Sequence, residues 1–244
     1  MASAHGRNEG TMAASIERTD REHVILLHGL AAYRWQLLPL AWRLERTGFS
    51  TLRYGYPSLF RGVRHHAERF DRFLERFEQE RPGEAFHLVV HSMGGIVTRA
   101  LLERRVPQGL RRIVMLGTPN RGSHAARRLA PVLGAICPPL RELSDRGESL
   151  VHRLGEVAGI ECGVIAARSD WVVALDATRL ASAVDHQTVP GAHSQLLFRR
   201  DVAEMTANFL RTGAFVVDAV VDAPRGVAPR FSANSVNSVV SKSL

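Results

Sequence analysis

The chain contains little cysteine and almost no lysine. Cys137 and Cys162 are the only cysteines in 244 residues; two are too few for the disulfide framework of a small exported domain, so we expect both to be reduced and buried. Lys242 is the only lysine, and the formal net charge of +8 therefore comes almost wholly from arginine. The arginines are spread along the chain rather than gathered in one arm. This distribution predicts a solvated surface with at most weak contact to anionic membranes, and no nucleic-acid partner.

Long apolar runs are also missing. No stretch approaches the roughly 18 consecutive apolar residues of a membrane-spanning helix, and residues 1–21 lack the apolar centre of a signal peptide. We therefore expect a cytoplasmic protein without an integral membrane segment. Residues 1–21 are mostly polar and small, which predicts a flexible N-terminal segment, and the Ser/Asn/Val-rich end predicts a mobile C-terminal tail over 216–244. Residues 22–215 remain for a single domain.

Short apolar runs alternate with helical patterns along this domain. A branched run over 24–27 and another over 87–90 are typical of buried strands, whereas residues 35–46, 63–77 and 96–102 repeat apolar side chains at helical spacing. The apolar face of the first helix is expected to contain Leu37, Leu38, Ala41 and Leu44. Such alternation predicts the α/β class, with a mainly parallel central sheet covered by helices on both faces.

The run over 87–90 is followed by the sequence His91-Ser92-Met93-Gly94-Gly95, in which two glycines come shortly after a serine. A strand that stops at such a sequence predicts a tight strand-to-helix turn, which would push the serine hydroxyl out of the sheet. The main-chain N–H after the serine would then point at the reacting carbonyl group. Ser92 is therefore the candidate nucleophile.

Four segments in a fixed order resemble the lipase-like branch of the α/β-hydrolase family. They are residues 26–30 (Leu-Leu-His-Gly-Leu), 56–58 (Tyr-Pro-Ser), 90–95 (Val-His-Ser-Met-Gly-Gly) and 116–123 (Leu-Gly-Thr-Pro-Asn-Arg-Gly-Ser). The resemblance implies the α/β-hydrolase fold and a serine esterase activity. It also implies an oxyanion hole formed by the main-chain N–H groups of Leu30 and Met93.

The resemblance further implies that an acid and a base follow the serine, in that order. Asp170 comes just after the strand-like run 161–167, and His193 follows the strand-like run 185–189. These two complete the predicted catalytic triad with Ser92. Asp176 and Asp185 are the competing carboxylates, and His186 is the competing imidazole.

Residues 122–157 separate two strands by more than a simple connection requires, which predicts a cap insertion. In relatives of this branch the region covers the active site, so an apolar inner face would favour a hydrophobic ester. Ordinary helices packed on the sheet are the alternative. Pro131, Pro138 and Pro139 are expected to divide the segment into short helices. Its apolar side chains at helical spacing are Leu129, Val132, Leu133, Ile136, Leu140 and Leu143.

These features together predict a serine hydrolase that cleaves carboxylic esters through a Ser-His-Asp triad and an acyl-enzyme intermediate. A thioesterase or an acyltransferase could use the same residues. A non-catalytic protein that binds a hydrophobic ligand or partner is a further alternative, favoured by Val90 and Trp171, which stand where the family commonly has smaller residues. We expect no cofactor and no metal, because His87 and His91 have no carboxylate or cysteine at ligand spacing. The acyl chain length, the substrate-binding residues and the oligomeric state are left open.

Overall fold

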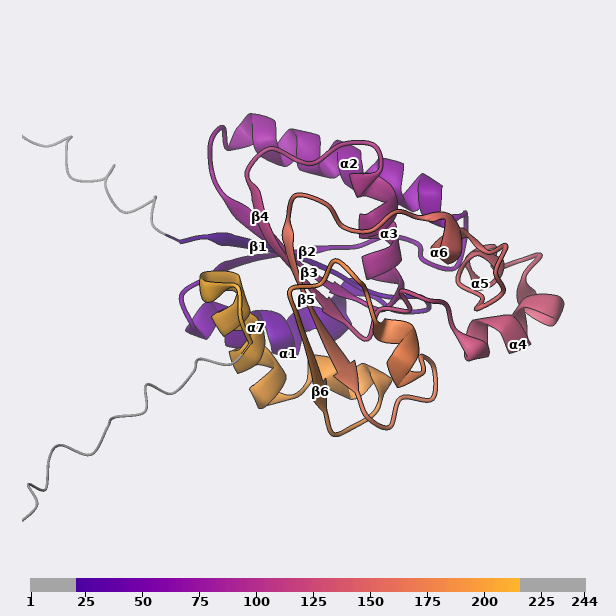
Figure 1. Cartoon of the computed structure of the whole chain (residues 1–244). Coiled ribbons are helices and arrows are strands. Elements are labelled where there is room, and N and C mark those ends of the chain that lie inside the picture. The colour runs from indigo at the N-terminus through magenta and orange to yellow at the C-terminus, as the bar shows by residue number, and fades with distance from the viewer. Residues whose placement is uncertain (1–20, 216–244) are drawn as a thin grey trace, which may run out of the picture.

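Six strands form one parallel sheet in the computed structural model, which describes residues 21–215. The strand order is β2-β1-β3-β4-β5-β6, and every neighbouring pair is parallel (Figure 1). The strands are β1 (His23–Leu27), β2 (Ser50–Tyr54), β3 (Phe86–His91), β4 (Leu110–Leu116), β5 (Glu161–Ala167) and β6 (Asp185–Val189). The predicted α/β class with a parallel sheet is confirmed. The segments expected to be flexible, 1–21 and 216–244, lie outside the described residues apart from Arg21.

Helices cover both faces of the sheet, as predicted. The first face carries α2 (Val63–Glu80) and α3 (Met93–Leu102), and the second carries α1 (Leu38–Arg46) and α7 (Arg200–Thr212) (Figure 1). The strand side chains alternate between two buried clusters. In β1, Ile25 and Leu27 belong to the cluster under α2 and α3, whereas Val24 and Leu26 belong to the cluster under α1 and α7. This alternation is the period-two pleat of a strand that is buried on both faces.

The apolar face of α1 differs from the prediction at one position. Leu37, Ala41 and Leu44 are buried as expected, but Leu38 is 43% exposed and Leu40 takes its place in the core. A short 3₁₀ turn, η1 (Arg34–Leu37), precedes α1. From Leu37 onward the buried positions then follow the i, i+3, i+4, i+7 spacing of one helix face, which leaves Leu38 outside it.

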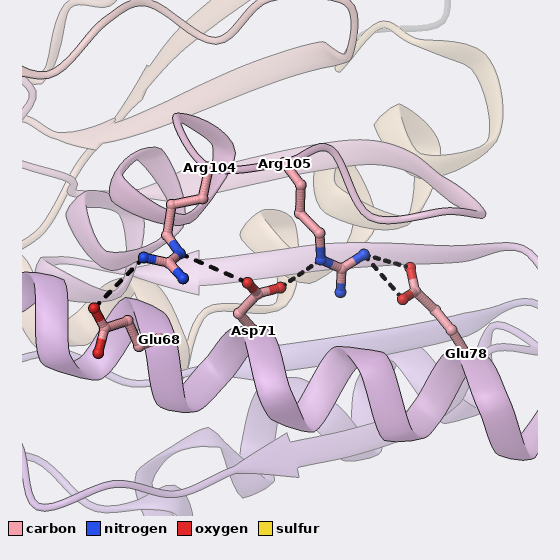
Figure 2. A network of polar contacts seen from close by, with 5 residues as sticks. All are labelled: Glu68, Asp71, Glu78, Arg104 and Arg105. Atoms are coloured by element: carbon pink, nitrogen blue, oxygen red, sulfur yellow. Dashed lines mark hydrogen bonds and ion pairs between the residues drawn. The ribbon is translucent and has the colours of Figure 1, made fainter.

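Helix α2 is held to the end of α3 by a chain of charged groups (Figure 2). Asp71 is nearly buried, and its Oδ1 accepts from Arg105 Nε at 2.6 Å, while Oδ2 lies 3.8 Å from Arg104 Nε. Arg105 also pairs with Glu78 at 3.0 Å, and Arg104 with Glu68 at 3.5 Å. The two arginines lie one residue beyond the end of α3, so the network joins α2 to the connection between α3 and β4.

The predicted insertion contains three helices, α4 (His124–Leu133), α5 (Pro139–Glu142) and α6 (Leu150–Arg153). Pro138 and Pro139 begin α5 as expected, but Pro131 lies inside α4 and does not end it. Proline near a helix end removes one hydrogen bond, and only two residues of α4 remain after it. The predicted apolar stripe is also divided. Leu140 and Leu143 are buried, whereas Leu129, Val132, Leu133 and Ile136 are exposed.

Both cysteines are free and buried, as the sequence predicts. Cys162 lies on β5, next to the edge strand β6, with no exposed surface, and burial raises the pKa of its thiol to about 12. Cys137 lies just before α5. A buried thiol with a raised pKa is a poor nucleophile, so neither cysteine competes with Ser92 for that role. Among the helices of residues 21–215, none has both the length and the apolarity that a membrane crossing requires.

Candidate active site

Ser92 lies on a sharp turn between β3 and α3. Its backbone has φ 54° and ψ −123°, a conformation that glycine adopts far more readily than other residues. The Ser92 N–H donates to the main-chain oxygen of Leu116 at 2.9 Å, which fixes the turn against the end of β4. The residue as a whole is 8% exposed. The strained turn expected from the sequence is present at this position.

Glycines let the turn lie close to its neighbours. A Cβ on Gly29 would lie 2.8 Å from the Cβ of Ser92, and a Cβ on Gly94 would lie 3.0 Å from the main-chain oxygens of Leu27 and His28. A Cβ on Gly95 would overlap the side chain of Thr118. The glycines at these positions therefore allow the ends of β1 and β3 and the segment after β4 to approach one another.

The strain at Ser92 predicts an unusual order of stabilities among variants. Ser92→Gly should have a higher free energy of unfolding than Ser92→Ala, by about 1 kcal/mol or more, because glycine relieves the positive φ and alanine does not. Urea unfolding of the two variants measures the difference. The same pair at Ser50, in the extended strand β2, serves as the control, and there glycine should be the less stable. An equal or reversed order at Ser92 would mean that the turn is not strained.

His193 and Asp170 contact each other directly. His193 Nδ1 lies 2.6 Å from Asp170 Oδ2, and only 1% of the Asp170 side chain is exposed. Two main-chain bonds hold their loops together, since Arg168 N–H donates to Val189 O at 2.9 Å and Ser169 N–H to Gly191 O at 3.0 Å. The other Asp170 oxygen, Oδ1, accepts from the N–H groups of Val172 and Val173 at 2.8 and 2.9 Å. The carboxylate therefore closes its own turn and binds the imidazole at the same time.

The competing residues are engaged elsewhere. Asp176 is exposed and lies 3.6 Å from Arg179, and Asp185 accepts from the Phe215 N–H at 2.8 Å. His186 lies within β6, as predicted, and its Nε2 is 3.0 Å from Thr178 Oγ1. None of these three contacts His193 or Ser92 among the hydrogen bonds and ion pairs of the described residues.

Ser92 and His193 lie beside the same segment at the end of β4. Ser92 bonds to Leu116, and a Cβ on the next residue, Gly117, would lie 3.2 Å from the His193 ring. Among the hydrogen bonds of residues 21–215, none joins Ser92 Oγ to His193 Nε2. Catalytic hydrogen bonds are often long before substrate binds and shorten in the complex.

His91 packs against His193 and was not expected to contribute to the site. The ring centroids are 4.8 Å apart, and His91 Nε2–H donates to the main-chain oxygen of His193 at 3.3 Å. Burial, and secondarily the proximity of His193, lowers the pKa of His91 to about 3. His91 is therefore neutral near pH 7. Its position before Ser92 is visible in the sequence, but its contact with a residue 102 positions later is not.

The low pKa of His91 predicts acid sensitivity. The unfolded chain binds a proton at His91 near pH 6.5, whereas the folded chain does not until about pH 3. Between these values, this histidine should lower the free energy of unfolding by about 1.4 kcal/mol for each unit by which the pH falls. His91→Gln keeps an N–H donor and removes the titration, so its stability should fall less steeply with decreasing pH. Urea unfolding of both proteins at pH values stepped downward from 6.5 measures the slopes, and equal slopes would contradict the assignment.

Tyr56 fixes the loop after β1 through two hydrogen bonds to His28. The Tyr56 hydroxyl donates to His28 O at 2.8 Å, and the Tyr56 N–H donates to His28 Nε2 at 3.3 Å. His28 Nδ1–H donates to Gly29 O at 2.9 Å, so both ring nitrogens are engaged and burial lowers the pKa of this imidazole. The N–H groups of Leu30 and Met93 donate to no other described residue. They are thus available to a ligand.

Val90 and Trp171, the two residues that favour the alternative of a non-catalytic protein, differ in their exposure to solvent. Val90 is fully buried in the core under α2 and α3, where its side chain does not prevent the turn at Ser92. Trp171 is 90% exposed and follows Asp170 in the loop after β5. Neither residue displaces the contact between Asp170 and His193.

Comparisons with known proteins agree with this architecture. A family model described as the alpha/beta hydrolase fold matches residues 22–138. The chain is similar to the mature lipase of Bacillus licheniformis, with 15% sequence identity, a TM-score of 0.64, and coverage of 80% of this chain and 92% of that one. No curated protein matches the sequence.

Two further solved structures are similar. Aspergillus fumigatus lipase B has 17% identity and a TM-score of 0.65, covering 78% of this chain and 52% of that one. The monoacylglycerol lipase of Paleococcus ferrophilus has 18% identity and a TM-score of 0.54, covering 76% and 94%. At these identities the likeness concerns the fold.

Proposed function

This chain has the α/β-hydrolase fold, and we propose that it is a serine hydrolase of carboxylic esters. The contact of 2.6 Å between His193 Nδ1 and Asp170 Oδ2, at the same end of the sheet as the strained Ser92, is the observation that carries the proposal. A carboxylate on one imidazole nitrogen leaves the other nitrogen free to accept a proton. The lipase neighbours support hydrolase activity as the general class.

The proposed reaction has two steps. Ser92 Oγ attacks the ester carbonyl while His193 Nε2 takes the hydroxyl proton, and the Leu30 and Met93 N–H groups stabilise the oxyanion. When the intermediate collapses, the bond to the alcohol breaks and the alcohol leaves with the proton from His193. Water then attacks the acyl-enzyme with His193 as the base, releasing the acid and restoring the serine.

Exposed apolar side chains favour an ester with an apolar acyl group. Tyr33 and Trp35 follow β1, and Trp171 and Val172 follow β5. Both strands run parallel to β3, so their carboxyl ends lie at the same edge of the sheet as Ser92. The four residues are 70%, 60%, 90% and 40% exposed. An apolar chain that covered them would gain roughly 25 cal/mol for each Å² removed from water. We therefore propose a lipid-like rather than a strongly polar ester.

Labelling with a fluorophosphonate probe tests the proposal. The purified protein should be labelled, and Ser92→Ala and His193→Ala should not, because the probe requires an activated serine. Hydrolysis of p-nitrophenyl esters of increasing chain length then reports the preferred acyl group. A folded wild-type protein that resists the probe would favour a non-catalytic binding protein instead. Labelling without net hydrolysis, but with acyl transfer to added alcohols, would indicate an acyltransferase.

A further inference from the structure

A cavity of about 560 Å³ lies within the insertion, between α4, α5 and α6. Figure 1 shows these three helices beyond the end of the sheet, beside α3. The cavity contains none of the residues predicted for the ester site. It is lined by Arg127, Ala130, Pro131, Arg141, Glu142, Ser144, Arg146, Glu148, Ser149, Leu150 and Arg153.

The charge of the lining is unbalanced. Arg127 lies 3.2 Å from Asp145 and is thereby paired. In contrast, the ion pairs among residues 21–215 include no partner for Arg141, Arg146 or Arg153. All three side chains belong to exposed residues and keep their positive charge in water. Three guanidinium groups on one concave surface attract an anion.

One carboxylate of the lining also bonds to the neighbouring helix α2. Glu142 Oε2 accepts from the Val63 N–H at 2.7 Å, at the start of α2. Burial raises the pKa of Glu142, against the effects of Val63, Arg64 and Arg153. Glu142 thus bonds to the start of α2 while its charge still acts on Arg153. With Glu148 it supplies two negative charges against the four arginines of the lining, which leaves the lining positive.

The cavity also offers a neutral donor and an apolar wall. Ser144 is 4% exposed, and its Oγ accepts from the Arg146 N–H at 3.3 Å. Among the hydrogen bonds of the described residues, the Ser144 hydroxyl donates none, so its proton is available to a ligand. Ala130, Pro131 and Leu150 supply apolar surface on the same lining.

We propose that this cavity binds an organic phosphate. A phosphate monoester carries about −1.5 to −2 charge near neutral pH and three acceptor oxygens, which suits several guanidinium groups and a hydroxyl better than a single carboxylate does. The phosphate contacts Arg141, Arg146 and Arg153, and its organic group lies against the apolar wall. The binding site is separate from Ser92 and does not depend on the proposed esterase activity.

Hexyl phosphate is the probe that tests this site. Isothermal titration with the full chain should show binding of hexyl phosphate, weaker binding of inorganic phosphate, and none of 1-hexanol. Each of Arg141→Gln, Arg146→Gln and Arg153→Gln should weaken the binding about tenfold, since each removes a charged hydrogen bond. Arg128→Gln, on the same helix as Arg127 but outside the lining, should bind as wild type does. Ser92→Ala should also bind normally.

Vesicles distinguish a lipid headgroup from a soluble phosphate ester. Phosphatidylcholine vesicles with and without phosphatidic acid should be compared by cosedimentation, using wild type and the three glutamine variants. If the protein binds vesicles only when they contain phosphatidic acid and only when the three arginines are present, the ligand is a lipid headgroup. If it binds hexyl phosphate but no vesicles, the ligand is a soluble phosphate ester. The proposal is overturned if hexyl phosphate does not bind, or if it binds all three variants as tightly as Arg128→Gln. Because these arginines are exposed, the variants are expected to fold, and thermal unfolding without ligand checks this.

Discussion

Ser92→Ala is expected to lower kcat for ester hydrolysis by about a million-fold, to the level that binding and oxyanion contacts alone sustain. The hydroxyl of Ser92 is the group that would form the acyl-enzyme, and no described neighbour on the turn can replace it. Met93 and His91 flank it, and neither offers an oxygen nucleophile. Hydrolysis of p-nitrophenyl butyrate under saturating conditions measures the loss.

Ser50→Ala is the matched control for this substitution. Ser50 begins β2 at the opposite end of the sheet, so the activity of Ser50→Ala should equal that of wild type. The alanine at position 92 should leave the fold intact, because it fits the same volume and the Ser92 N–H still bonds to Leu116. Substantial turnover by a folded Ser92→Ala protein would show that the ester is cleaved without this nucleophile.

Asp170→Asn is expected to lower kcat by about ten thousand-fold through the tautomer of His193. The N–H groups of Val172 and Val173 donate to Oδ1 of Asp170, so an asparagine oxygen should occupy that position. Its NH₂ group then faces His193 Nδ1, where the carboxylate oxygen now lies. A donor at this place favours the proton on Nε2, and the imidazole can no longer accept the proton of Ser92.

Asp176→Asn separates this effect from a general change of charge. Asp176 is exposed, and it is one of the two alternatives to Asp170 that the sequence offers for the triad acid. Its replacement should leave kcat unchanged. Nitrogen-15 NMR of the histidine ring should report the altered tautomer in Asp170→Asn directly. Equal activity of Asp170→Asn and wild type, with an unchanged tautomer, would remove Asp170 from the proposed mechanism.

Much of the fold could be predicted because its signals are local. The branched run that ends at Leu27 and the run that ends at Ser92 mark buried strands, and the glycines after each mark the turns. The candidate acid and base were found in the same way, as polar residues just beyond strand ends. Their roles remain predictions that the variants above test.

Contacts between distant parts of the chain could not be predicted from local patterns. The packing of His91 on His193 depends on the order of strands in the finished sheet, which no short stretch encodes. The exposure of Leu38 depends on where α1 starts, and one residue of shift moves a side chain off the buried face. In the insertion, Pro131 was expected to end a helix, yet its place near the last turn of α4 makes the missing hydrogen bond tolerable.

The strand order also bears on the time at which the proposed site is completed during synthesis. β3 pairs with β1, and from β4 to β6 each new strand pairs with the one made just before it, so the sheet can grow outward as the chain leaves the ribosome. His193 follows β6, the strand that is added last and forms the edge. A nascent or truncated chain that already contains Ser92 therefore lacks the proposed base. The proposed ester hydrolysis would then begin only when the sheet is complete, and incomplete copies of the chain would be inactive.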